Sequence, residues 1–355
     1  MTEKPPQTVE SIERGAVGVG LPNRYQQLVR WAESQCGGVS FKLSPLPPGA
    51  SARHYFRLKF ADDRPSLIVR DAPAHGDSCR FARIARLLAD AGVHAPEVIA
   101  QNLEQGFLLV TDLGDATYLS ALNHKNADSL FEAAIDALIR WQLASRASVL
   151  PYVDERLLRG ELHLFVKWYL ERHLGMSLDS EERDIFDRVA AEIVARNLLQ
   201  PTGYMHGDYT ARNLMVCDPT PGVLDFQDAM YGSLTYDLAS LFWSSSREWP
   251  EEQVRRWTIR YWEKVKSAGL AVRHRFDEFC EDLEWTALQR HLKVLGVFAR
   301  LNYRDSKPQY LVNSPRLLRH IRAVAVRYSP LTPLLQILDR GGNASKLNAA
   351  YRNCA

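Results

Sequence analysis

One stretch, residues 204–239, constrains the fold most, because it sets three acid or amide side chains around two short apolar runs. Asp208 lies five positions before Asn213, and Asp225 follows the second apolar run directly. The runs, Leu-Met-Val and Val-Leu, are separated by Cys-Asp-Pro-Thr-Pro-Gly, a turn-forming sequence that predicts a β-hairpin. Such a hairpin would bring Asn213, before its first strand, close to Asp225, after its second.

The order and spacing of these three side chains suit phosphoryl transfer. That reaction needs a carboxylate to orient the attacking hydroxyl and take its proton, and further oxygen ligands to hold Mg²⁺. Protein kinases meet these needs with H-R-D-x-x-x-x-N followed by D-F-G; this chain has H-G-D-x-x-x-x-N followed by D-F-Q. We therefore predict Asp208 as the base or hydroxyl-orienting residue, and Asn213 and Asp225 as metal ligands. Any one of them alone could be an ordinary polar residue ending a strand.

The full pattern, H-G-D-x-x-x-x-N-L-x-V…D-F-x-D-A…G…Y-D-L-A, resembles the aminoglycoside phosphotransferase and choline kinase-like superfamily. A closer likeness is to the bacterial anomeric sugar kinases that phosphorylate N-acetylmuramate and N-acetylglucosamine at C1 in cell-wall recycling. That likeness rests on Leu-Asp-Phe-Gln-Asp-Ala in the hairpin and on four further segments, at 51–57, 71–73, 103–109 and 289–304. The resemblance covers about residues 40–310, and its motif is more specific for phosphoryl transfer than for the acceptor.

The resemblance implies an α+β, two-lobed protein-kinase-like fold with a small β-rich N-lobe and a larger, mainly helical C-lobe. A length of 355 residues also favours two domains. We predict a loose segment at 1–20, a nucleotide-binding N-lobe at 21–113, a C-lobe with the catalytic loop, metal site and acceptor pocket at 114–340, and a loose tail at 341–355.

Four candidate nucleotide-binding residues lie in the predicted N-lobe and at its end. Ser51 is in a loop of small residues that could cover phosphates, although a plain hairpin turn is the alternative. Arg70 ends a predicted strand where kinases have Lys, and the next helix, 78–91, offers no Glu partner. Arg70 could therefore bind phosphate or be a solvated strand-end residue. By resemblance, Thr111 and Leu113 flank a hinge that meets the adenine edge.

Other polar residues near Asp208 have two interpretations each. His206 is expected to support the catalytic loop rather than transfer protons. Arg212 could reach the γ-phosphate or project into solvent, and Asp228 could lie beside the metal or cap a helix. Asp237, which opens an apolar helix, matches a family acid that braces the catalytic loop.

The acceptor pocket is expected on the C-terminal helices. On the helix predicted to span 275–300 and its continuation, one stripe carries Gln289, Lys293, Gly296, Arg300 and Arg304. A basic stripe with a glycine gap could face a sugar that carries a carboxylate, as N-acetylmuramate does. The alternative is a solvated helix face.

Bulk composition excludes several partner classes. A net charge of +2 gives no reason to expect nucleic acid or an anionic membrane as the main partner. The five cysteines are scattered without a metal-ligand spacing, which favours reduced thiols in a cytoplasmic protein. The N-terminus resembles no signal peptide, and no apolar segment approaches 18 residues. We expect a cytoplasmic monomer.

The leading hypothesis is an ATP- and Mg²⁺-dependent kinase for the anomeric hydroxyl of an N-acetylated amino sugar. The first alternative changes the acceptor to an aminoglycoside or a choline-like alcohol, whose positive charge would demand an acidic pocket. The second alternative is a nucleotide-binding protein whose catalysis has lapsed, which the absent Lys and Glu pair would favour.

Overall fold

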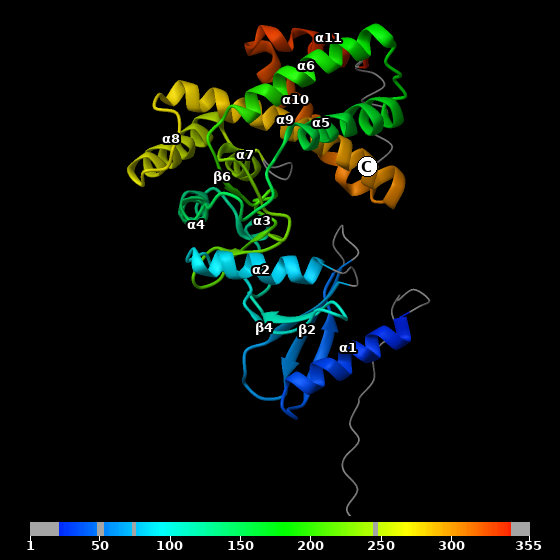
Figure 1. The fold of residues 1–355 in the computed structure, drawn as a ribbon, viewed down its shortest axis with the longest axis vertical. Coiled ribbons are helices and arrows are strands. Elements are labelled where there is room, and N and C mark those ends of the chain that lie inside the picture. The colour runs from blue at the N-terminus through cyan, green and yellow to red at the C-terminus, as the bar shows by residue number, and fades with distance from the viewer. Residues whose placement is uncertain (1–20, 48–52, 73–75, 244–247, 342–355) are drawn as a thin grey trace, which may run out of the picture. The chain divides into compact units, whose positions relative to one another are not determined.

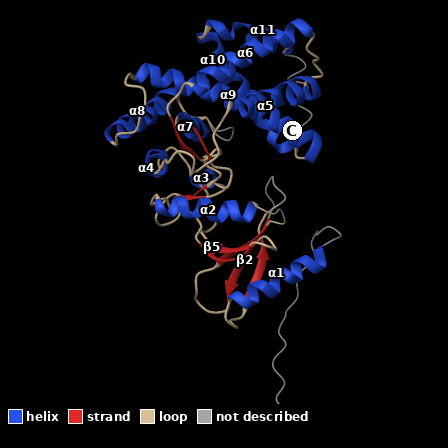
Figure 2. Ribbon diagram, in the orientation of Figure 1, coloured by secondary structure: helices blue, strands red, loops and turns tan. Residues whose placement is uncertain are grey.

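The protein is described by a computed structural model that covers residues 21–47, 53–72, 76–243 and 248–341. The chain divides into two compact units, residues 1–79 with 98–112 and residues 80–97 with 113–355. The first unit is rich in strands and the second is mainly helical (Figure 2), which confirms the predicted fold class. The predicted loose segment 1–20 and Ser51 lie outside the described residues, as does the predicted loose tail 341–355 except for Gly341, which ends a helix.

The first unit is built on a five-stranded antiparallel sheet with strand order β1-β2-β3-β5-β4 (Figure 1). Leu28 of helix α1 packs with Val69 of β3 and Phe107 of β5 in one buried cluster, so the apolar face of α1 covers the sheet. Helix α2 begins in this unit and continues into the second. The bounds are α1 Leu21–Gln35, β1 Phe41–Pro45, β2 His54–Phe60, β3 Leu67–Asp71, α2 Asp77–Asp90, β4 Val98–Asn102 and β5 Phe107–Thr111.

The second unit is a set of helices with two small antiparallel sheets, β6-β9 and β7-β8, that carry the kinase-like motif. Its bounds are α3 Tyr118–Ala121, α4 Ala127–Leu143, α5 Glu155–Leu164, a π-helix Phe165–His173, α6 Ser180–Leu198, β6 Thr202–Met205, β7 Leu214–Met215, β8 Gly222–Val223, β9 Met230–Ser233, α7 Thr235–Phe242, α8 Glu251–Ser267, α9 Phe276–Asp305, a 3₁₀ turn Pro308–Asn313, α10 Ser314–Arg327, a 3₁₀ turn Ser329–Leu331 and α11 Thr332–Gly341.

Helix α9 is the central helix of the second unit. It is 30 residues long, and every residue from 285 to 292 is buried, so this part has no solvent-facing side. Gly296 lets α9 approach the junction of α5 and the π-helix closely: a Cβ at this position would lie 2.4 Å from the Leu164 carbonyl carbon. A helix enclosed in this way can hold polar side chains only where partners meet them.

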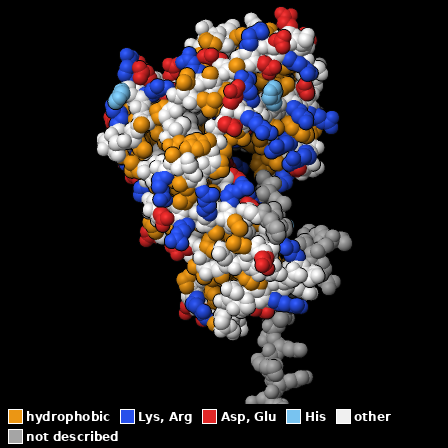
Figure 3. Space-filling view, in the orientation of Figure 1, with side chains coloured by type: hydrophobic (Ala, Val, Ile, Leu, Met, Phe, Trp, Pro, Cys, Tyr) orange, Lys and Arg blue, Asp and Glu red, His pale blue; other side chains and the backbone are white. Residues whose placement is uncertain are grey.

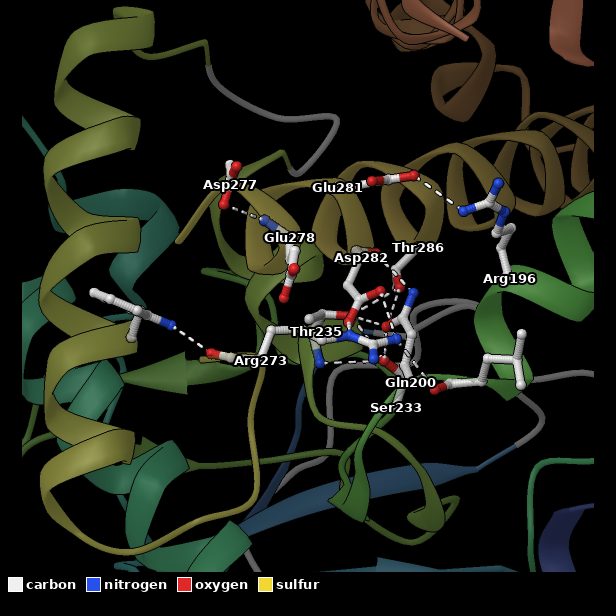
Figure 4. Close-up of polar contacts among 12 residues, drawn as sticks. Arg196, Gln200, Ser233, Thr235, Arg273, Asp277, Glu278, Glu281, Asp282 and Thr286 are labelled. Carbon is white, nitrogen blue, oxygen red and sulfur yellow. Dashed lines mark hydrogen bonds and ion pairs between the residues drawn. The ribbon is translucent and has the colours of Figure 1, made fainter. Parts of the chain in front are cut away.

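A buried polar network ties α9 to the start of α7 (Figure 4). The Gln200 side-chain oxygen accepts hydrogen bonds from the hydroxyls of Thr235 at 2.7 Å and Thr286 at 3.0 Å, and from Ser233. The Gln200 amide donates to the backbone oxygen of Asp282 at 2.8 Å. Since nearly all of these donors and acceptors are satisfied within the protein, the network holds α7 and α9 in one arrangement.

Candidate active site

The hairpin predicted from the motif is present. β7 pairs with β8 through Leu214 opposite Val223 and Met215 opposite Gly222. One residue beyond this ladder, the Leu224 N–H donates to the Asn213 carbonyl oxygen at 2.8 Å. Asn213 therefore lies next to the segment that carries Asp225, as the spacing required.

Asn213 is hydrogen-bonded directly to Asp208. Its buried side-chain amide donates to both the backbone oxygen and Oδ2 of Asp208, at 2.9 Å each. The side-chain oxygen of Asn213 remains as the atom that could bind a hard cation. The Asp208 side chain is 39% exposed, so its carboxylate is open to an incoming hydroxyl.

Asp225 follows β8 with a left-handed backbone, φ 59°, which is uncommon for a residue other than glycine. Such a conformation is concentrated at functional sites. Its side chain is exposed, and Oδ1 accepts a hydrogen bond from Gln227 Nε2 at 2.7 Å. The described residues contain no cluster of three or more His, Cys, Asp or Glu suited to a metal. One carboxylate and one amide fit Mg²⁺, which takes few protein ligands and fills its shell with phosphate oxygens and water.

The loop before Asp208 is braced by Asp237 at the start of α7. Asp237 accepts hydrogen bonds from the backbone N–H of His206 at 2.6 Å and of Gly207 at 3.0 Å. Burial raises the pKa of the Asp237 carboxyl, while the neighbouring His206 and these two N–H donors act in the opposite direction. The His206 ring lies between the Leu224 carbonyl oxygen, 2.9 Å from Nε2, and the Asp208 N–H, 3.2 Å from Nδ1. Both residues thus support the loop, in agreement with the interpretation from sequence.

Two guanidinium groups flank the Asp208 carboxylate. Arg290 Nη2 lies 3.5 Å from Oδ1, and Arg212 Nη2 lies 3.8 Å from Oδ2. Arg212 is exposed, whereas the Arg290 side chain is only 6% exposed. Arg290 was not predicted as a site residue; the signal in the sequence was a charged residue among the apolar residues of the helix predicted at 275–300.

Asp228 does not cap a helix. The strand β9 begins two residues later, and the exposed Asp228 carboxylate pairs with Arg80 at 3.0 Å. The N-cap alternative is therefore wrong, because the chain after Asp228 is extended and offers no helical N–H groups. A position beside the metal stays a prediction.

Comparison with known proteins agrees with this geometry. Residues 42–278 match the family model described as phosphotransferase enzyme family. The chain belongs to this phosphotransferase family. It is 44% identical to the N-acetylmuramate/N-acetylglucosamine kinase of Pseudomonas aeruginosa, over 89% of this chain and 96% of the relative. It is 40% identical to the enzyme of the same name from Pseudomonas putida, with the same coverage.

Solved structures with the same fold include the gentamicin complex of APH(2")-IIa, with a TM-score of 0.58 at 15% identity. That match covers 86% of this chain and 97% of the other. A choline/ethanolamine kinase family protein from Mesorhizobium loti matches with a TM-score of 0.58 at 16% identity, covering 87% and 98%. These likenesses confirm the kinase-like fold predicted for the phosphotransferase.

In the first unit of this phosphotransferase, Arg70 is fully buried, so the solvated strand-end alternative is wrong. Arg70 Nη2 donates to Asp77 Oδ2 at 2.7 Å, and Nη1 donates to Ser78 Oγ at 3.1 Å. Asp77, the first residue of α2, is the acidic partner of Arg70, in a helix that contains no Glu. An ion pair between β3 and the following helix is therefore present with Arg and Asp in place of Lys and Glu.

The other two nucleotide-binding candidates lie on either side of the boundary between the units. Thr111 is the last residue of β5 and pairs with Leu67 of β3. Leu113 belongs to the second unit and lies near the β7–β8 hairpin, where a Cβ on Gly222 would be 2.7 Å from its Cδ1. Their contact with a nucleotide stays a prediction.

The stripe on α9 is only partly what the sequence suggested. Gln289 and Lys293 face α5, where both contact the Glu161 carboxylate, at 2.8 and 2.6 Å. Gly296 packs against the backbone of α5, so the glycine gap is filled by protein and faces neither sugar nor solvent. Arg300 is half-buried, and Arg304 is exposed and paired with Asp305.

Arg304 also lines a surface hollow of about 470 Å³ between the π-helix and the end of α9. Its wall is formed by three cationic residues, one acidic residue and two aromatic residues: Lys167, Arg172 and Arg304, Glu171, and Trp168 and Tyr303. Lys and Arg side chains gather on the surface over α5 and the end of α9 (Figure 3). The charged side chains that line this hollow therefore carry a net positive charge.

Proposed function

We propose that this phosphotransferase transfers the γ-phosphoryl group of ATP, with Mg²⁺, to the anomeric C1 hydroxyl of N-acetylmuramate or N-acetylglucosamine. The observation that carries the proposal is the charge around Asp208, where the guanidinium groups of Arg212 and Arg290 lie 3.8 and 3.5 Å from the carboxylate. A cationic aminoglycoside or choline would be repelled there, whereas a neutral or acidic sugar would not. The names of the two Pseudomonas relatives support the same acceptors.

In this proposal Asp208 orients the C1 hydroxyl and accepts its proton as the new phosphorus–oxygen bond forms and the bond between the γ-phosphorus and the leaving ADP oxygen breaks. An anomeric hydroxyl is slightly more acidic than an ordinary alcohol, so one half-exposed carboxylate can suffice. Asn213 fixes Asp208 Oδ2 through its amide and leaves Oδ1 of Asp208 towards Arg290. Asn213 and Asp225 would hold Mg²⁺, which when bound neutralises charge on the phosphate oxygens.

The first unit would bind the nucleotide. Two aminoglycoside phosphotransferase structures of the same fold hold ADP and AMP-PNP, respectively, which supports ATP as the donor. We propose Arg70 as a phosphate ligand or as the support of one, Thr111 and Leu113 as the adenine-binding hinge, and Ser51 in the phosphate-covering loop. Arg212 is proposed to contact the γ-phosphate. Asp228, Arg300 and Arg304 remain candidates for substrate contact or support.

Within the described residues, no helix is both long and apolar enough to span a bilayer. A cytoplasmic location and a monomeric state are part of the proposal, and light scattering of the purified protein tests the second.

The deciding experiment measures ADP release with Mg²⁺-ATP over N-acetylmuramate, N-acetylglucosamine, glucose, choline and kanamycin. We expect turnover on the two N-acetyl sugars, an acid-labile C1 phosphate as product, and a loss of about 10²- to 10⁴-fold in kcat in Asp208→Asn. Asp339→Asn, which removes an exposed acid on α11, serves as the matched control. Turnover on choline or kanamycin alone would overturn the acceptor assignment.

A further inference from the structure

Arg290 is a buried cation whose side chain makes one long hydrogen bond among the described residues. It is 5% exposed, and Nη2 lies 3.5 Å from Asp208 Oδ1, which is long for a charge-assisted hydrogen bond. Among the described residues, its Nε has no hydrogen-bond partner. Burying a guanidinium N–H without a hydrogen-bond acceptor is unfavourable. A ligand that supplies an acceptor atom to Arg290 would remove this penalty and bind more tightly.

The position of Arg290 is fixed from several sides. One turn along α9, Lys293 Nζ donates to the Tyr236 hydroxyl at 3.1 Å and pairs with Glu161. One turn back, Thr286 joins the Gln200 network that holds the start of α7 (Figure 4). Because α7 also carries Asp237, which braces the catalytic loop, Arg290 and Asp208 are held in place by the same scaffold.

The location of Arg290 limits which part of the acceptor it can meet. The reacting hydroxyl must lie about 2.6–3.2 Å from the Asp208 carboxylate. A donor 3.5 Å from the same carboxylate then reaches the substituents next to that hydroxyl. Arginine only donates hydrogen bonds, so its partner must be an acceptor atom.

We infer that Arg290 is the residue that recognises the 2-acetamido group, by donating to its carbonyl oxygen. The inference rests on the proposed function. In both proposed sugars the carbon next to C1 carries an acetamido group, and the two sugars differ only at C3. A residue beside the C1 hydroxyl should therefore recognise the acetamido group, which both sugars share. Two acceptors lie next to C1, the acetamido carbonyl oxygen and the ring oxygen, and the amide carbonyl oxygen is the stronger of the two.

The test is a cycle that changes the enzyme and the acceptor separately. Arg290→Gln and Arg290→Lys are assayed with N-acetylglucosamine and with glucose, which has a hydroxyl in place of the acetamido group. We expect kcat/KM for N-acetylglucosamine to fall about 10- to 100-fold in the Gln variant, mainly through KM. For glucose the change should stay within about threefold, so that the preference for the acetamido sugar collapses. Arg290→Lys should recover part of the preference, because it keeps the charge but loses the planar fork.

A merely structural or base-tuning role would act on both acceptors alike. An equal fold-loss on N-acetylglucosamine and glucose overturns the inference and leaves the proposed function standing. Wild-type enzyme that phosphorylates no N-acetyl sugar overturns both. Arg316→Gln, which removes a mostly buried arginine paired with Glu248 on another part of the unit, should leave the preference unchanged.

Binding without turnover provides a second measurement that does not depend on the variants' rates. N-acetylglucosamine is titrated calorimetrically into the wild type and into Arg290→Lys, with melting curves recorded for both. Weaker binding of N-acetylglucosamine at an unchanged melting temperature supports the inference. Equal binding by both proteins overturns it, because the lysine cannot reproduce the arginine fork.

Discussion

Two arginine–aspartate ion pairs, one in each unit, differ in geometry. We call the short pair, Arg70–Asp77, the closed pair and the long pair, Arg290–Asp208, the open pair. Arg70 and Asp77 are 2.7 Å apart, and Arg53 also donates to Asp77, at 2.9 Å. Arg290 and Asp208 are 3.5 Å apart, and the carboxylate is 39% exposed. The first pair is therefore short and largely shielded from solvent, whereas the second is long and leaves its carboxylate open to solvent.

The closed pair stabilises the position of a helix, whereas the open pair leaves a carboxylate that a ligand can contact. The Arg70–Asp77 pair joins β3 to the start of α2, where a carboxylate is also favoured by the helix dipole. The Arg290–Asp208 pair lies at the start of the kinase-like motif and on a fixed scaffold, yet the distance between its charged groups is long. Open pairs on rigid elements are expected where substrate completes the hydrogen bonding.

Breaking the closed pair should have the largest effect on stability. In Asp77→Asn, Arg70 is left buried without its carboxylate, so we expect the free energy of unfolding to fall by about 3 kcal/mol. Burial raises the pKa of Asp77, but hydrogen bonding and charge from Arg53 and Arg70 outweigh it, so the pKa is lowered below 3.8. The carboxylate thus stabilises the fold above pH 3.8, and its contribution is lost as the pH falls through the lowered pKa.

Urea unfolding of the wild type and Asp77→Asn between pH 7 and pH 3 measures this effect. The gap between the two proteins should be constant from pH 7 to about pH 5 and shrink below the carboxyl's ordinary range. Asp62→Asn, whose exposed carboxylate pairs with Arg64, should leave the unfolding midpoint unchanged. A gap that widens on acidification would show that the pair is not what Asp77 contributes.

The contrast between local and distant partners also explains how much the sequence could predict. Asp208, Asn213 and Asp225 lie within 18 positions on one hairpin, so their spacing and the turn residues determine their proximity. Asp77 was not predicted, because the helix was expected to begin at Ser78 and its partner for Arg70 was expected to be a Glu, whereas Asp at the first helical position reaches Arg70. Periodicity on α9 identified a stripe, but it could not show that α5 covers it.

Two further differences have the same origin. The apolar residues from Leu162 to Leu174 have helical spacing, but the chain here is the end of α5 followed by a π-helix, Phe165–His173, and a 3.6-residue period does not distinguish these geometries. The strand β4, Val98–Asn102, was not predicted, because its residues are only partly buried and lack a clear apolar alternation. In both cases packing against other elements, rather than local pattern, decides the structure.

Gly296→Ala tests the scaffold that holds the open pair, with an intermediate effect. An added Cβ would lie 2.4 Å from the Leu164 carbonyl carbon and 2.6 Å from the Phe165 nitrogen, so α9 must shift away from α5. We expect a loss of about 1–3 kcal/mol in unfolding free energy, as for other overpacked sites. Gly160→Ala on α5 is the matched control, because a Cβ there meets nothing within 4 Å and alanine favours the helix. Equal effects of the two substitutions on the melting temperature would contradict the close approach.

Arg304→Gln tests the exposed end of the same helix and should have the smallest effect. The side chain is 56% exposed and pairs only with Asp305 among the contacts described, so the melting temperature should hardly change. If Arg304 contacts the lactyl carboxylate, KM for N-acetylmuramate should rise about two- to fivefold in the variant while KM for N-acetylglucosamine stays constant. The difference between the two KM values should fade as salt is raised towards about 0.5 M, since exposed charges are screened.

Arg322→Gln, which removes an exposed arginine on α10 paired with Asp339, is the matched control and should change neither KM value. The two sugars share the group assigned to Arg290 and differ only in the lactyl group. A rise in both KM values would therefore show that Arg304 supports the structure rather than recognises the acceptor.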